Sequence, residues 1–130
     1  MYLPMLTNAH PVRRYLIGQQ YLVIVLTDCE SDGEIQYQYV VIVYQLPPDA
    51  NPDKLPKPVM AVAAETNDMV SEPDAYFLGV FPGEGHLNLG LSADWGDLGK
   101  FTAKALEIVA EHLQIAQAPL PLPEDKGRPS

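Results

Sequence analysis

Apolar residues in the first half of the chain come in short runs rather than at helical spacing. Residues 15–17 and 21–27 are such runs, and the second has no polar interruption before Thr27. A run of this kind is typical of a central strand that is covered on both faces. The polar stretch that follows, residues 28–33, ends in Asp-Gly, which favours a turn. We therefore predict a hairpin whose partner strand covers residues 34–46.

That partner strand begins with strict alternation of apolar and polar residues. Tyr37 and Tyr39 alternate with glutamines, so a regular strand would place both tyrosines on one face. From residue 40 onward, both faces are apolar. We expect one end of this strand to be more exposed than the other, and Tyr44 and Tyr21 to lie near the two tyrosines across the hairpin.

The second half of the chain predicts further strands and then a helix. Residues 47–58 are rich in proline and form a surface connection, because proline lacks the N–H that strands and helices need. Residues 59–65 form an alanine-rich strand, and 75–81 and 86–92 form a second hairpin. In this hairpin, alternation places Leu87, Leu89 and Leu91 on one face.

One helix is expected, starting near Asp94 or Asp97, either of which can cap its first N–H groups, and running to about Gln114. Its apolar residues recur at helical spacing, with lysines and glutamates on the opposite face. The proline-rich stretch 116–130 is predicted to be an extended or disordered tail, which leaves residues 1–115 as a single domain.

These elements predict an α+β fold: a curled, largely antiparallel sheet of five or six strands with one C-terminal helix packed across a face. A helix of ~17 residues is about 25 Å long and cannot shield every strand of a wide sheet. The remaining apolar surface therefore requires either a sheet that curls on itself or a partner that covers it.

Composition excludes several functional classes. The chain has 130 residues, with 8 basic and 17 acidic side chains and a formal net charge of −9. The basic residues are scattered, which argues against nucleic acid and anionic membrane surfaces as partners. No run approaches ~18 apolar residues, so no membrane span is expected. The N-terminal residues lack a signal-peptide pattern and Cys29 is the one cysteine, so we predict a cytoplasmic location.

No motif in the sequence specifies catalysis, a metal or a cofactor. Asp28, Glu30 and Asp32 precede Gly33 as in part of a calcium loop, but Tyr39 stands where the bidentate glutamate belongs. Cys29 lies between two acidic residues, which opposes thiolate formation. We therefore assign no metal, no cofactor and no catalytic residue. A weak enzymatic hypothesis remains, in which Glu84 and His86 do acid–base work with an acidic partner such as Asp94.

The tyrosines carry the main functional hypothesis. Tyrosine has a large apolar ring with a polar tip, which suits protein contact surfaces and small-ligand pockets. Tyr37, Tyr39 and Tyr44 are therefore the candidate binding residues. We predict a non-enzymatic protein-interaction or assembly factor, with a protein partner or a second copy of itself in a homodimer. The alternative is a small-molecule-binding domain with a pocket between the curled sheet and the helix.

Overall fold

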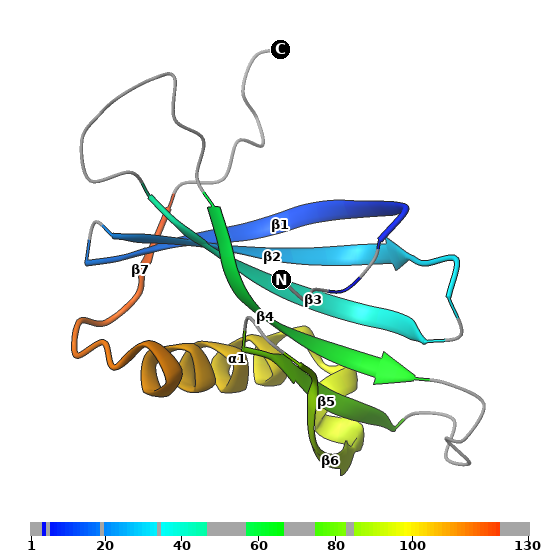
Figure 1. Cartoon of the computed structure of the whole chain (residues 1–130). Coiled ribbons are helices and arrows are strands. Elements are labelled where there is room, and N and C mark those ends of the chain that lie inside the picture. Colours follow the sequence, from blue (N-terminus) through cyan, green and yellow to red (C-terminus); the bar gives the residue numbers. More distant parts are fainter. Residues whose placement is uncertain are drawn as a thin grey trace.

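The computed structural model describes residues 4, 6–18, 20–33, 35–46, 57–66, 75–82 and 85–122. These residues form one antiparallel seven-stranded sheet in the order β6-β5-β4-β3-β2-β1-β7, one 3-10 helix and one α-helix (Figure 1). The elements are β1 (Asn8–Ile17), β2 (Tyr21–Glu30), β3 (Gln36–Gln45), β4 (Lys57–Thr66), β5 (Tyr76–Phe81), β6 (Leu87–Ser92), η1 (Ala93–Gly96), α1 (Leu98–Leu113) and β7 (Leu120–Pro121). The predicted α+β fold is confirmed, with β7 as an additional strand.

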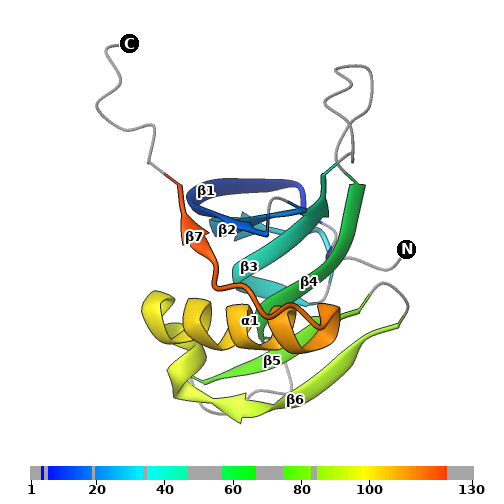
Figure 2. The same ribbon diagram turned by 90° about the vertical axis from the view of Figure 1, so that its left-hand side faces the viewer.

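The sheet curves around the helix. In Figure 2, β1 and β2 lie on one side of α1, and β5 and β6 lie on the other. The helix contacts the central strands β3 and β4. Because the sheet is curved, a single helix can cover more of its strands than it could cover on a flat sheet.

Apolar residues are buried on both faces of the sheet. The helix face carries the larger core, in which valines of β2, β3 and β4 pack against Phe101, Ala105 and Val109 of α1. On the opposite face, Val40, Ala61, Ala63 and Phe81 form a second cluster, against which Leu6 and other residues pack. The centre of the sheet is therefore buried within one chain, and no partner is needed to cover these residues.

The helix begins and ends close to the predicted residues. Asp97 is the N-cap, and its Oδ2 accepts a hydrogen bond from the backbone N–H of Lys100 at 2.9 Å. Gln114 ends the helix in the left-handed region, at φ 55°. Phe101 lies on the buried side, with its ring centroid 5.6 Å from that of Tyr39 in β3.

A register shift in β3 contradicts the predicted shared face of the tyrosines. Tyr37 pairs with Glu65 of β4, whereas Tyr39 pairs with the adjacent residue, Ala64. Directly paired residues point to the same face, so the extra residue places the two tyrosines on opposite faces. Tyr39 packs in the core beneath the helix and Tyr37 packs in the second cluster.

A second register shift, in β6, contradicts the predicted row of leucines. Phe77 of β5 pairs with Leu91 and Val80 pairs with Leu87, so three steps along β5 match four along β6. Leu87 and Leu91 therefore lie on opposite faces. Gly90 has φ 115°, a conformation that glycine adopts most readily and that allows the extra residue to fit.

Strands β1 and β7 extend the fold beyond the prediction. β1 begins at Asn8 rather than at residue 15, so it is longer than the apolar run that predicted it. β7 pairs with β1, and the N–H of Leu122 donates to the carbonyl of Arg14 at 2.9 Å. The rest of the predicted tail, residues 123–130, and most of the predicted proline-rich connection lie outside the described residues.

Candidate functional site

A buried acid–imidazole pair joins β4 to the start of β6. Glu65 lies near the end of β4, and its Oε1 is 2.9 Å from Nε2 of His86, the residue directly before β6. The side chain of Glu65 is 3% exposed and that of His86 is 24% exposed. A charged carboxylate this deeply buried needs compensation, and the imidazole supplies a hydrogen bond to one of its two oxygens.

Gly79 and Phe81 of β5 create the space for this pair. A Cβ atom at Gly79 would lie 2.8 Å from Nε2 of His86 and nearer still to the carboxyl group of Glu65. The ring of His86 stacks on Phe81, with centroids 4.4 Å apart and an interplanar angle of 8°. Because β5 lies between β4 and β6, the pair forms only if this strand has no side chain at position 79.

Burial raises the pKa of the Glu65 carboxyl group, and the nearby His86 partly opposes this effect. The second carboxyl oxygen, Oε2, is buried and has no hydrogen-bond partner among the described residues. A carboxyl group in this state binds a proton more readily than one in water. The pair can therefore take up or release a proton inside the fold, close to the edge of the sheet.

The structure changes the predicted acid–base group. His86 is bonded to Glu65, which the sequence analysis did not select, and Glu84 lies outside the described residues. Asp94 lies beyond the other end of β6, with its Oδ1 3.5 Å from Nζ of Lys100. Two sequence features could have pointed to Glu65. It is an acidic residue at the end of an apolar strand, and the next strand contains a glycine, Gly79.

The second feature is the exposed edge of the sheet at β6. Leu87, Leu89 and Leu91 are 55%, 54% and 40% exposed. They alternate along the strand with asparagine, glycine and serine. No residue of β6 is charged, and none is proline. Charges and prolines commonly protect edge strands, so the β6 edge lacks two of these protections.

Two local features limit how regularly β6 could pair with another strand. The shifted register at Gly90 interrupts the regular ladder, and the N–H of Gly90 donates to Oδ1 of Asn88 at 2.8 Å. The other edge of the sheet is different in kind, because β7 is a two-residue strand that includes Pro121. A proline has no N–H to offer to another strand, so β7 is the better protected edge.

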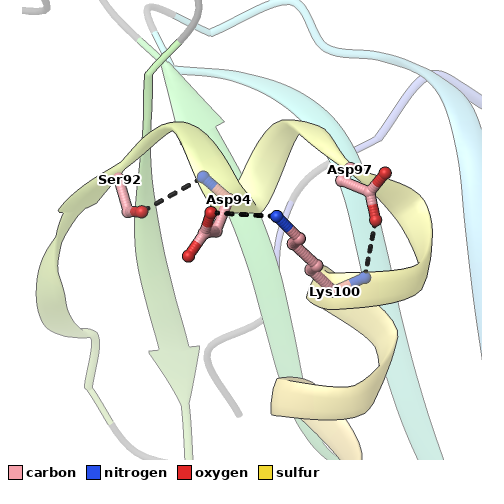
Figure 3. Close-up of polar contacts among 4 residues, drawn as sticks. All are labelled: Ser92, Asp94, Asp97 and Lys100. Carbon is pink, nitrogen blue, oxygen red and sulfur yellow. Dashed lines mark hydrogen bonds and ion pairs between the residues drawn. The ribbon is translucent and has the colours of Figure 1, made fainter.

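Polar contacts fix the end of β6 where the chain turns toward the helix (Figure 3). Oγ of Ser92 accepts a hydrogen bond from the N–H of Asp94 at 3.1 Å, which caps η1. Asp94 in turn contacts Lys100 of α1, and Asp97 caps the helix. Strand β6 is thus tied to the helix at its end and to β4, through His86, at its start.

The candidate binding tyrosines do not gather at one place. The hydroxyl of Tyr39 donates to the carbonyl of Gly96 at 3.3 Å beneath the helix. Tyr37 and Tyr44 lie at opposite ends of β3. No common surface of the three residues is formed, and their role in binding stays a prediction.

The remaining candidates from the sequence are the acidic turn of Asp28, Glu30 and Asp32 and the thiol of Cys29. In the described part of the chain, no group of three or more His, Cys, Asp or Glu side chains is placed to hold a metal ion. Burial, followed by the charge of Asp28, raises the pKa of Cys29 to about 11. Such a thiol is a poor nucleophile at neutral pH.

The comparisons with known proteins give no relatives: no family model, no curated protein and no solved structure matches the chain. Among the described helices, none is long and apolar enough to span a membrane.

Proposed function

We propose that the protein is a non-enzymatic interaction or assembly protein that associates with a second copy of itself through the β6 edge. The observation that supports this is the set of three substantially exposed leucines on an uncharged edge strand, Leu87, Leu89 and Leu91. Elsewhere in the sheet, the central apolar residues are buried on both faces within one chain. The proposal includes a cytoplasmic setting, because a chain with one cysteine forms no internal disulfide.

Charge favours β6 as the place where two copies meet. Each chain carries a formal net charge of −9, so two copies repel each other over most relative orientations. β6 has no charged side chain, and an edge strand is self-complementary when two copies pair antiparallel about a twofold axis. The helix surface and β1, which contains Arg13 and Arg14, carry charged side chains. β7 is uncharged, but it is only two residues long and includes Pro121.

The exposed area supports a weak dimer rather than a permanent one. Burying a whole leucine side chain contributes about 1.5–3 kcal/mol, so the exposed half of each leucine contributes about 1 kcal/mol. Six leucines, three from each copy, then contribute at most about 6 kcal/mol, because Leu87 and Leu91 lie on opposite faces and edge pairing covers them only in part; each new main-chain hydrogen bond adds about 1 kcal/mol. Association costs about 4–15 kcal/mol in lost freedom of motion, so we expect a dissociation constant in the micromolar range or weaker.

Sedimentation equilibrium over a wide concentration range tests this proposal. The wild type should change from monomer to dimer as concentration rises, and Leu89→Lys should weaken the dimer by about 30–150-fold, equivalent to about 2–3 kcal/mol. Leu120→Lys is the matched control, since Leu120 is 62% exposed but lies in β7, at the other edge. Equal effects of the two variants contradict the β6 assignment. A monomer at every concentration that carries a small bound mass in native mass spectrometry favours the small-molecule alternative.

A further inference from the structure

The Glu65–His86 pair lies at the start of β6. His86 directly precedes β6, and its Nε2 lies 2.9 Å from Oε1 of Glu65 in β4. The contact crosses β5, so it connects the edge strand to a strand in the interior of the sheet. A change in this contact therefore acts on the edge that carries the exposed leucines.

Glu65 lies between two aromatic residues of the neighbouring strands. Its direct partners in the neighbouring strands are Tyr37 of β3 and Phe77 of β5. Tyr37 shares a face of the sheet with Glu65 through this pairing, and His86 is the titratable group whose charge and hydrogen bond act on it. Cys29 packs in the same cluster as Tyr37, with its pKa raised to about 11, so its thiol stays neutral near pH 7.

We propose that the Glu65–His86 pair acts as a proton-dependent contact that controls how firmly β6 is held on the sheet, and thereby how well two copies associate through it. This inference rests on the proposed function for its second half only. The first half concerns the monomer and can be tested separately.

The direction of the pH dependence follows from the charge of the pair. With one added proton, a carboxylate and an imidazole are neutral overall, whichever of the two carries the proton. Without that proton, a negative charge remains buried, and one of its oxygens, Oε2 of Glu65, has no hydrogen-bond partner in the described part of the chain. Release of β6 exposes the carboxylate to water, so rising pH favours release. The raised pKa of Glu65 agrees, since it means that the closed state holds the proton more tightly than water-exposed glutamate does.

The first experiment measures the monomer. Hydrogen exchange of the β6 amides that bond to β5 is compared between Leu89→Lys and the double variant Leu89→Lys/Glu65→Gln at each pH from 6 to 8.5. The ratio of the two rates cancels the intrinsic effect of pH on exchange. We expect this ratio to rise about tenfold over the range, because Glu65→Gln removes the buried carboxylate while His86 is present in both variants. A ratio that stays constant overturns the inference.

The second experiment measures association over the same pH range. The wild-type dissociation constant should rise about tenfold from pH 6 to 8.5, and Glu65→Gln should make this rise smaller, because the buried carboxyl group is gone. His112→Gln is the control, because His112 lies in the last turn of α1 and outside the pair. An unchanged slope in Glu65→Gln overturns the link to association. A wild type that never dimerises refutes the proposed function, while the exchange experiment still decides the role of the pair in the monomer.

Discussion

Adding one methyl group at Gly79 should disrupt the fold at the buried pair. The Cβ atom of Gly79→Ala would lie 2.8 Å from Nε2 of His86 and closer to the carboxyl group of Glu65. Real Cβ atoms do not tolerate such contacts, so one side chain has to move. Glu65 is 2% exposed and has no open space to enter. The backbone of Gly79 has no positive φ that would itself oppose alanine.

The expected loss of stability in Gly79→Ala is the sum of two costs. Overpacking of a core position costs about 1–3 kcal/mol. Separation of Glu65 from His86 adds the cost of a buried charge without its partner, which ranges up to about 3–5 kcal/mol when a pair is fully broken. Since some relaxation will preserve part of the contact, we expect Gly79→Ala to lower the free energy of unfolding by about 3 kcal/mol.

Urea unfolding followed by circular dichroism measures this free energy, and a mutant cycle identifies its cause. In a Glu65→Ala/His86→Ala background neither clashing side chain remains, so Gly79→Ala should cost less than about 1 kcal/mol there. Gly99→Ala is the control. A Cβ at Gly99 comes no nearer than 3.4 Å to Asp97, and alanine favours helices by up to about 1 kcal/mol. An equal cost of Gly79→Ala in both backgrounds would refute the steric argument.

Four further outcomes are expected. Stability should fall as pH rises above the ordinary glutamate range, because the folded state holds the Glu65 proton more tightly than the unfolded chain; Glu65→Gln should flatten this part of the curve in urea titrations. Phe101→Ala should cost about 3–5 kcal/mol in the same assay, because it leaves a cavity beneath the helix. Asp97→Ala should cost about 1 kcal/mol by removing the helix cap. Cys29 should react slowly with iodoacetamide at pH 8, with a rate that still rises at pH 10, because its pKa is about 11.

The elements of the fold were predictable because their signals are local. The apolar run that became β2 and the capping side chain of Asp97 each specify an element through nearby residues alone. β1 was predicted too short, since Pro11 and the polar residues around it resemble a loop. A strand next to the edge of a sheet tolerates such residues better than a central one.

The site was less predictable because it depends on pairing between distant strands. Glu65 and His86 are 21 residues apart, and no spacing rule connects them. The face assignments of the tyrosines and leucines failed at register shifts, where one extra residue reverses the alternation. Glycines were the available signals: Gly90 marks the irregular position in β6, and Gly79 marks the close approach of two side chains.

The pairing of β7 with β1 has a consequence for synthesis of the chain on the ribosome. Strands β1 to β6 pair with neighbours in sequence, so this part of the sheet can form progressively as the chain emerges. Within the described chain, the outer side of β1 pairs with a strand only at Tyr15 and Leu16, whose partners Leu120 and Pro121 follow every other described element. Until those two residues are translated, this end of β1 also has open backbone groups, and wrong strand pairing with other chains is easier there.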